Sequence, residues 1–431
     1  MALLLKNVHM IDPALDINKV GDIIVRDGKI VEIGENLSIE KGITRDLDGK
    51  VLIPGMVDMH VHLREPGFEQ KEDIASGTRA AARGGFSAVC CMPNTKPVLD
   101  NATQVASVLS RAAEVGKCRV HVAGACSKDL AGETLSEMGD MVAHGVVAFT
   151  DDGRGVQGAG MMRRVLDYAS MFNRVVMSHC QDEDLVGDGQ VNEGVASTRL
   201  GMLGWPAEGE EIQIARDIAL CRLTRCPLHI QHISTARGLD LVRAAKHEGL
   251  PVTCEVTPHH LFLTEDDITD AYDTNFKVNP PLRSAQDAAA LVEGVKDGSI
   301  DCIVTDHAPH AAWDKACEFE VAAFGMTGLE TSLALVLTHL VAPGIIGYAR
   351  MVELMSINPR TLLRLEPVSL TPGSTADFTI FDPKIRWTVV AADFVSKAKN
   401  SAFIGKELTG RATDVYVAGY ATLEEGGIVE E

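Results

Sequence analysis

The chain has 431 residues, of which 46% are hydrophobic and 23% are charged. This composition is typical of a globular protein with a large core, and the length accommodates a barrel of about 250 residues plus an accessory unit. The formal net charge of -20 argues against a nucleic-acid partner, because an acidic surface repels phosphate backbones. The sequence has no apolar stretch of about 18 residues, which argues against a membrane span.

The ten cysteines include no CxxC pairs at the spacing of a zinc ribbon, and several lie in apolar runs. Buried, reduced thiols are the interpretation we favour, and they indicate a reducing compartment. The first ten residues lack the basic segment and the long apolar core of a signal peptide. We therefore expect a cytoplasmic protein.

Short alternating strands are predicted at both ends of the chain, and Asp27-Gly28 indicates a hairpin turn between two of them. The expected strands are 3–10, 22–26 and 29–33 near the N-terminus, and 378–381, 387–390 and 415–419 near the C-terminus. Because strands need partners, residues 1–53 and 367–431 are predicted to form one small β-rich domain.

Residues 54–366 alternate between short apolar runs and helical patterns, which favours βα units around a parallel sheet. Eight candidate strands end near Asp58, Met92, Ala125, Thr150, His179, His232, Val256 and Asp306. The predicted helices are 72–83, 102–115, 161–171, 210–222, 236–247 and 285–295. We therefore predict an α/β protein with a (β/α)₈ TIM-type barrel. A doubly wound open sheet is the alternative, but no glycine-rich nucleotide loop follows the first strand.

The clearest local motif is His60-Val61-His62, which ends the first apolar strand of this region. Residues i and i+2 of a strand point to the same side, so the two imidazoles are able to share one metal ion. An HxH pair is common by chance and is only suggestive alone. Here it lies where barrel enzymes place their chemistry, at the carboxyl end of a strand.

Other strand ends supply matching groups: Asp151 and Asp152, His179, His232, and Asp306. For any one histidine, a structural role is as good an interpretation as ligation. Four histidines and two aspartates at one rim are costly to bury without a metal, and this ligand set suits zinc and similar divalent ions.

Further polar residues are expected near the same rim. Arg64 offers a planar fork for a carboxylate, although a surface salt bridge is the alternative without a metal site nearby. Asn94 ends the second strand, His310 follows the eighth, and Asn279 is either a turn residue or a ligand contact. Structural roles are assigned to His259, His260 and His229, the last because it lies three residues from His232 and should face the other side.

The chain resembles the amidohydrolase superfamily, and specifically the dihydroorotases of the longer bacterial type. The resemblance rests on His60-Val61-His62-Leu63-Arg64-Glu65-Pro66-Gly67, Met92-Pro93-Asn94-Thr95, Thr305-Asp306-His307-Ala308-Pro309-His310 and Phe324-Gly325. HxH alone marks many amidohydrolases, whereas HxHxREPG with MPNT is far narrower. The resemblance covers essentially the whole chain.

The resemblance implies a role for each matched residue. Two zinc ions per subunit would be bound by His60, His62, Asp152, His179, His232 and Asp306. Asp306 would also be the catalytic acid/base, taking a proton from a zinc-bound hydroxide that attacks the ring amide. The substrate would be bound by His62, Arg64, Asn94, Asn279, His310, Phe324 and Gly325.

One feature departs from many relatives, which bridge their metals with a carbamylated lysine. No lysine lies between Lys128 and Lys246, so an aspartate is expected to form the bridge. Asp152 is preferred over Asp151 by its spacing to His179, and the choice between these neighbours stays open. Residues 311–321 resemble the family poorly, so no role is assigned there.

The resemblance implies reversible hydrolysis of dihydroorotate to N-carbamoyl-aspartate in pyrimidine biosynthesis. It also implies a homodimer, and it leaves association with aspartate transcarbamoylase open. One alternative is an allantoinase or hydantoinase, against which Arg64 argues, because an uncharged hydantoin needs no guanidinium. The other is an inactive scaffold, against which the complete set of expected ligands argues.

Overall fold

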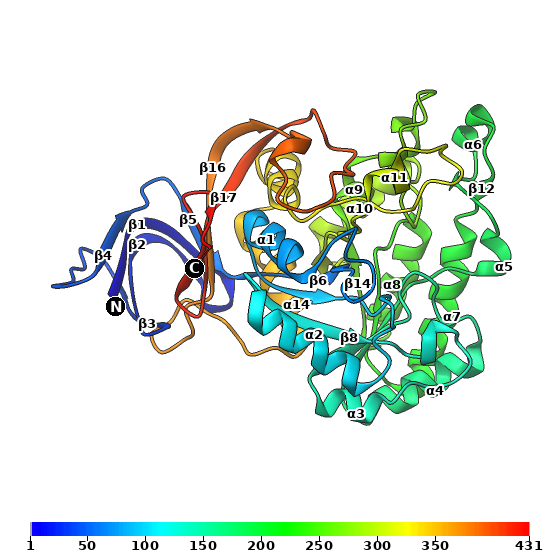
Figure 1. Ribbon diagram of the computed structural model, residues 1–431, viewed down its shortest axis with the longest axis horizontal. Coiled ribbons are helices and arrows are strands. Elements are labelled where there is room, and N and C mark those ends of the chain that lie inside the picture. Colours follow the sequence, from blue (N-terminus) through cyan, green and yellow to red (C-terminus); the bar gives the residue numbers. More distant parts are fainter. Residues whose placement is uncertain (1, 431) are drawn as a thin grey trace.

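The computed structural model describes residues 2–430 as a barrel flanked on one side by a β-rich unit that contains both chain ends (Figure 1). The barrel strands are β6 Met56–Val61, β7 Phe86–Cys91, β8 Arg119–Gly124, β9 Val146–Phe149, β10 Val175–Ser178, β13 Leu228–Ile230, β14 Val252–Val256 and β15 Cys302–Ile303. All eight predicted strands are therefore present.

The barrel strands are parallel and follow one another around the sheet in chain order, from β6 to β15. A parallel bridge between Val61 and His307 joins the first strand to the segment after the last, and the His62 amide donates to the His307 carbonyl at 2.9 Å. This contact brings the two ends of the sheet together, and the predicted (β/α)₈ barrel is confirmed.

The main helices are α1 Ile74–Gly84, α2 Ala102–Val115, α3 Met138–Ala143, α4 Ala159–Ser170, α7 Glu208–Thr224, α8 Ala236–His247 and α10 Ala285–Asp297. The shorter ones are α5 Glu183–Val186, α6 Val195–Leu200, α9 Pro258–Phe262, α11 Ala312–Lys315, α12 Ser332–Val336, α13 Tyr348–Val352 and α14 Asn358–Leu362. The short pair β11 Val191–Asn192 and β12 Gly204–Trp205 lies among them.

Two of the predicted helices match their observed bounds, and the start of another was wrong. Helix α1 begins at Ile74 rather than at residue 72, because the Asp73 side chain caps it by accepting from the Ser76 amide. Glu72 lies before this cap, where its buried carboxylate accepts from the Ser396 hydroxyl and the Lys397 amide. It therefore ties the start of α1 to the C-terminal part of the chain.

The β-rich unit contains β1 Ala2–Asp12, β2 Ile17–Arg26, β3 Lys29–Gly34, β4 Ile43–Asp46, β5 Val51–Pro54, β16 Phe378–Thr388, β17 Glu407–Val417, β18 Tyr420–Glu424 and β19 Gly427–Ile428. Strand β5 pairs with β1 on one side and with β16 on the other, so one sheet joins both chain ends. The two strands predicted at 378–381 and 387–390 are one strand, β16. Its pairing with β17 is irregular between Asp382 and Arg386, which explains the interrupted sequence pattern.

Among residues 2–430, no helix combines the length and the apolar character that crossing a membrane requires.

Candidate metal centre and substrate pocket

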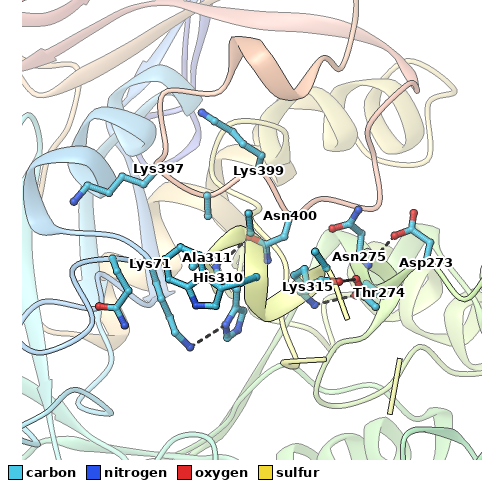
Figure 2. Close-up of a pocket in the computed structure, with 15 residues that line it drawn as sticks. Lys71, Asp273, Thr274, Asn275, His310, Ala311, Lys315, Lys397, Lys399 and Asn400 are labelled. Atoms are coloured by element: carbon cyan, nitrogen blue, oxygen red, sulfur yellow. Dashed lines mark hydrogen bonds between the residues drawn. The ribbon is translucent and has the colours of Figure 1, made fainter. Parts of the chain in front are cut away.

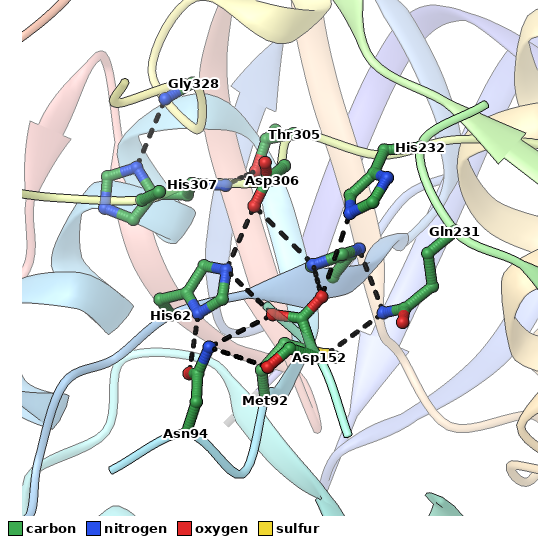
Figure 3. Close-up of polar contacts among 12 residues, drawn as sticks. His62, Met92, Asn94, Asp152, Gln231, His232, Thr305, Asp306, His307 and Gly328 are labelled. Atoms are coloured by element: carbon green, nitrogen blue, oxygen red, sulfur yellow. Dashed lines mark hydrogen bonds and ion pairs between the residues drawn. The ribbon is translucent and has the colours of Figure 1, made fainter. Parts of the chain in front are cut away.

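The carboxyl ends of the barrel strands bring six predicted metal ligands together, and Figure 3 labels His62, Asp152, His232 and Asp306 among them. His60 lies within β6, whereas the other five follow the last residues of their strands. All six side chains are buried, with exposed fractions of 6% or less. They are His60, His62, Asp152, His179, His232 and Asp306.

Asp152 lies at the centre of this group. Its Oδ1 atom is 3.3 Å from His60 Nε2, 3.6 Å from His179 Nδ1 and 3.8 Å from His232 Nε2. Its Oδ2 atom is 3.5 Å from His62 Nε2. Burial alone raises the pKa of this carboxyl, but the histidines outweigh burial and hold it well below its usual range. Asp152 is therefore an anion that faces four histidines.

The choice between the two neighbouring aspartates follows from where their side chains point. Asp151 accepts from the amides of Cys126 and Ser127 at 2.8 and 3.0 Å, and from the Ser127 hydroxyl at 2.5 Å. It faces these donors and holds the loop after β8. Asp152 is the aspartate that points to the histidines.

Asp306 lies on the other side of His62. Its Oδ1 atom is 3.0 Å from His62 Nε2 and 3.5 Å from His60 Nε2. Asn94 orients the same imidazole, because its Oδ1 lies 2.9 Å from His62 Nδ1, and its Nδ2 donates to Asp152 Oδ2 at 3.1 Å. Burial raises the pKa of Asp306, but the hydrogen bond from His62 and the nearby histidine charges outweigh it and lower the pKa.

These donors form two overlapping groups that fit a cation, His60 with Asp152 and His232, and His60 with His62 and Asp306. Within each group the candidate ligand atoms lie within 4.8 Å of one another. His60 Nε2 and Asp152 Oδ1 are buried, and neither has a hydrogen-bond partner among the described residues. Buried polar atoms are normally paired, so a divalent ion that prefers nitrogen and carboxylate ligands fits this site.

Three candidate residues have a left-handed backbone that non-glycine residues rarely adopt. The φ angles are +62° for Arg64, +30° for His232 and +44° for Asp306. Such conformations persist only where the surrounding structure imposes them, and they concentrate at functional sites. Here they turn side chains toward the rim just after a strand has ended.

The rim residues open into a cavity of about 250 Å³. It is lined by all seven predicted substrate contacts and by every predicted metal ligand except His60, which lies beneath it. The lining residues are His62, Arg64, Asn94, Asp152, Gly153, His179, His232, Asn279, Asp306, Ala308, His310, Phe324 and Gly325. Its volume is smaller than that of pockets for drug-sized ligands, which start at about 300 Å³.

Arg64 and His310 form one polar wall of the cavity. Arg64 donates through Nε to the Pro309 carbonyl at 3.1 Å, and its Nη2 atom is 3.4 Å from His310 Nε2. Burial lowers the pKa of Arg64 to about 10, so it remains a cation at neutral pH. Burial and the neighbouring cations lower the pKa of His310 to about 2, so this ring is neutral. Its Nε2 is 2.7 Å from the Phe324 carbonyl.

Gln181 connects a predicted metal ligand, His179, to a predicted substrate contact, Asn279. The Gln181 Oε1 atom lies 2.9 Å from His179 Nε2 and accepts from Asn279 Nδ2 at 3.0 Å. His179 Nδ1, the other ring nitrogen, faces Asp152 and His232. Gln181 therefore orients both residues, and sequence reasoning missed it.

A second, lysine-rich cavity of about 450 Å³ lies beside the first and shares His310 with it (Figure 2). Lys71 Nζ lies 3.2 Å from His310 Nδ1 and 3.3 Å from Asp314 Oδ2. Lys397 is paired with Asp73, and Lys399 donates to the carbonyls of Phe394 and Ser396. These lysines thus have partners within the chain.

Two buried lysines hold the segment that contains residues 311–321, to which the sequence assigned no role. Lys315 donates to the carbonyls of Thr274 and Ala323 at 2.9 and 2.6 Å. Lys277 donates to the carbonyls of Phe319 and Glu320 at 2.7 and 2.9 Å. Because Phe324 and Gly325 follow directly, these bonds fix the backbone that lines the site.

The expectation that His229 faces away from the site is wrong. Its ring is buried inside the barrel, and Nε2 lies 3.1 Å from Glu255 Oε2. The other Glu255 oxygen lies 2.6 Å from His60 Nδ1. Alternation fails as a guide because β13 ends at Ile230, and His232, with a φ of +30°, lies beyond the strand.

Glu255 itself was missed by sequence reasoning. Its signal was a single charged residue inside the apolar run Val252–Val256. Burial raises the pKa of its carboxyl, but the charges and hydrogen bonds of His60 and His229 outweigh burial and lower it to about 2. Glu255 is therefore a fully buried anion directly beneath the candidate metal centre.

Comparison with known proteins identifies the relatives of this site. A family model described as dihydro-orotase-like matches residues 49–238. The dihydroorotase of Acetivibrio thermocellus is 46% identical over 427 residues, which span 99% of this chain and 98% of the relative. The dihydroorotase of Pelotomaculum thermopropionicum is 47% identical over 425 residues, 99% of each chain.

Among solved structures, the L-hydantoinase (dihydropyrimidinase) of Arthrobacter aurescens superposes with a TM-score of 0.91 at 28% identity. The superposition covers all of this chain and 97% of that one. A D-hydantoinase (dihydropyrimidinase) from a Thermus species gives a TM-score of 0.85 at 25% identity, with 100% and 97% covered. The fold is thus that of cyclic amidohydrolases. Identities of 46% and 47% over nearly the full length of the two relatives show that the chain belongs to the dihydroorotase family.

Proposed function

We propose that this protein is a dihydroorotase, which interconverts (S)-dihydroorotate and N-carbamoyl-L-aspartate in de novo pyrimidine biosynthesis. The observation that carries the proposal is the composition of the 250 Å³ cavity. One wall offers carboxylate and imidazole ligands for cations, and another offers Arg64, Asn94 and His310 for an anionic substrate. A ring that bears a carboxylate as well as a reactive amide needs both.

The proposed cofactor is a pair of zinc ions per subunit. His60, His62 and Asp306 would hold one, His179 and His232 would hold the other, and Asp152 would contact both. The grouping of His60 with His62 and Asp306 supports the first site, and the distances of 3.6 and 3.8 Å from Asp152 Oδ1 to His179 and His232 support the second. When bound, such ions supply a water of lowered pKa and positive charge at the carbonyl oxygen.

The protein's own groups orient the substrate and move the proton. The Arg64 guanidinium forms a planar fork for the substrate carboxylate, Asn94 donates to it as well, and His310 lines the same part of the cavity. Asn279 and the backbone at Phe324 and Gly325 contact the ring. Asp306 is ionised because its pKa is lowered, so its carboxylate takes the proton of the attacking water and delivers it to the leaving ring nitrogen. Ring closure uses the same residues in reverse order.

A hydantoinase or allantoinase is the second candidate, because the solved structures superpose so well. Arg64 favours dihydroorotate over it. A buried cation beside a neutral hydantoin ring would lack a counter-charge at that position, and leaving a buried polar group unpaired costs binding energy. The inactive-scaffold alternative conflicts with a complete set of donors around Asp152.

The oligomeric state and the cellular compartment are proposed by analogy with the dihydroorotase family. A homodimer is proposed, and association with aspartate transcarbamoylase is an extension of that proposal. All ten cysteines are free thiols, nine of them buried, which supports a reducing compartment such as the cytoplasm.

The test is a substrate panel measured with zinc-loaded protein and with protein depleted by a chelator. Zinc-dependent loss of the ultraviolet absorbance of dihydroorotate, with hydantoin and allantoin turned over far more slowly, supports the proposal. Turnover of hydantoin or allantoin at a higher kcat/KM than dihydroorotate would replace it with the second candidate.

A further inference from the structure

The barrel interior beneath the candidate metal centre contains a chain of polar side chains. Thr253, on β14, has its Oγ1 atom 2.8 Å from His229 Nδ1, and His229 Nε2 lies 3.1 Å from Glu255 Oε2. Glu255 Oε1 lies 2.6 Å from His60 Nδ1. The chain thus runs from the middle of the barrel to the first predicted metal ligand.

All three links are enclosed by the barrel. His60, His229 and Glu255 are fully buried, with exposed fractions of 0%. Burying a carboxylate without compensation is expensive, so its partners define what it does. Its contacts are both imidazoles and the His232 amide, which donates to Glu255 Oε1 at 3.3 Å. Glu255 Oε1 therefore contacts His60, a predicted ligand of one metal ion, and the backbone of His232, a predicted ligand of the other.

The protonation pattern follows from the donors and acceptors. A carboxylate accepts hydrogen bonds and donates none, so the His60 Nδ1–H group donates to Glu255. The Nε2 atom of His60 then points away from Glu255, toward Asp152 Oδ1 at 3.3 Å and Asp306 Oδ1 at 3.5 Å. This nitrogen is buried and has no hydrogen-bond partner among residues 2–430.

We infer that Glu255 is a positioning residue of the metal centre, which fixes the ring orientation and tautomer of His60 and the backbone at His232, with His229 holding Glu255 in place. The inference rests on the cation site of the proposed function. A carboxylate that accepts from a metal-ligating imidazole raises the basicity of the ligand, and loss of such a partner typically weakens metal binding by about 10- to 100-fold. Glu255 is not expected to contact the substrate, because it does not line the cavity.

The experiment measures zinc affinity directly, by competition with a chromogenic chelator on metal-free protein, for the parent, Glu255→Gln and Glu255→Ala. Glu255→Gln keeps the shape and one acceptor oxygen but loses the charge, so we expect zinc to bind about tenfold more weakly, and Glu255→Ala about 100-fold more weakly. The visible spectrum of the Co²⁺-loaded protein should change with the altered ligand field at His60. The KM for dihydroorotate at saturating zinc should stay within twofold.

The matched control is Glu330→Gln, because Glu330 also carries a largely enclosed carboxylate, which accepts from the amides of Val395 and Ser396. It contacts none of the predicted ligands. Parental zinc affinity in Glu330→Gln together with the graded loss in the Glu255 variants supports the inference. Parental affinity in Glu255→Ala would overturn it, as would an equal loss in Glu330→Gln.

Thermal unfolding of the metal-free variants separates positioning from folding. Should Glu255→Ala fail to fold, Glu255→Gln decides, and an unchanged zinc affinity and cobalt spectrum in that variant would overturn the inference. A parent protein that binds zinc with this dependence on Glu255 but does not hydrolyse dihydroorotate would remove the proposed function and leave the inference standing.

Discussion

Buried carboxylates occur in both the β-rich unit and the barrel rim, and the two regions treat them differently. In the β-rich unit, Asp414 is fully buried, with Arg45 at 2.7 Å and Lys50 at 3.6 Å, and the amide of Glu425 donates to it. Asp377, also buried, accepts from Nε and Nη2 of Arg119 at 2.8 and 3.1 Å. At the rim, Asp152 faces four imidazoles, and its Oδ1 has no hydrogen-bond partner among the described residues.

The difference separates charge that stabilises a fold from charge kept for a ligand. In the first region the chain supplies the counter-ions, so the carboxylates are structural. In the second the protein concentrates polar atoms around one point and leaves His60 Nε2 and Asp152 Oδ1 without a hydrogen-bond partner among the described residues, which costs stability until a cation binds. The predictions below are ordered by expected effect, and each tests this distinction.

The largest effect is expected for Asp306→Ala. Loss of a positioned acid/base typically reduces the rate by about 10²- to 10⁴-fold. Because Asp306 belongs to the ligand group and not to the fold, the metal-free variant should unfold at nearly the parental temperature. Initial rates on dihydroorotate with matched zinc content, together with calorimetry, check both parts. Retention of more than a tenth of the parental kcat would remove Asp306 from the proposed role.

Asp414→Ala should show the opposite pattern. The change removes the buried partner of Arg45 and leaves it only the exposed carboxylates of Glu424 and Glu425. Breaking a buried ion pair typically costs about 3–5 kcal/mol of unfolding free energy. Zinc affinity should not change, because the site lies in the barrel. Urea unfolding and a zinc titration are the measurements. A weakened zinc affinity in folded Asp414→Ala would contradict a purely structural role for this carboxylate.

Metal removal should destabilise the parent protein. A ligand that binds only the folded state at 100 times its Kd contributes about 2.7 kcal/mol, so chelation should lower the unfolding temperature. In Asp152→Asn the same chelation should have a much smaller effect. Equal shifts in the two proteins would argue that the stabilising metal binds elsewhere.

Arg64→Met tests the substrate side of the rim. A hydrogen bond to a charged group contributes about 1.5–3 kcal/mol, so kcat/KM for dihydroorotate should fall by at least about tenfold. Any residual activity on uncharged hydantoin should be unaffected, and that comparison serves as the control. An equal loss on both substrates would assign Arg64 to structure.

The smallest effect concerns the loop that carries Phe324 and Gly325. Burial lowers the pKa of Lys315 to about 7, below its ordinary value of 10.5. Between these values the unfolded chain binds more protons, so the stability of the parent should rise with pH relative to Lys315→Met, by at most about 1.4 kcal/mol per pH unit. Urea unfolding of both proteins at several pH values measures the difference. A stability difference independent of pH would contradict it.

The sequence predicted the barrel because apolar strands and amphipathic helices have periodicities that depend on local residues. It predicted the rim for the same reason: a polar residue directly after an apolar strand has few places to point, as with His179 after β10. The HxH motif indicated that the two imidazoles lie together, because both residues lie at the end of one strand, β6, and point to one side.

What the sequence missed depends on contacts between distant segments. Glu255 and His229 are partners because β13 and β14 are neighbours in register, and no local pattern indicates that Glu255 reaches His60 on β6. Gln181 reaches Asn279 across 98 residues. The choice of Asp152 over Asp151 depended on the loop after β8, whose amides hold Asp151 away from the histidines.

The most direct test of the distinction is a titration of metal-free protein with zinc while hydrolysis of dihydroorotate is followed. The proposed pair of zinc ions predicts that activity rises with bound zinc and saturates at two ions per chain. Activity that is complete before any zinc is added, or zinc that binds without activity, would contradict the claim that the unsatisfied rim is the catalytic site of a dihydroorotase.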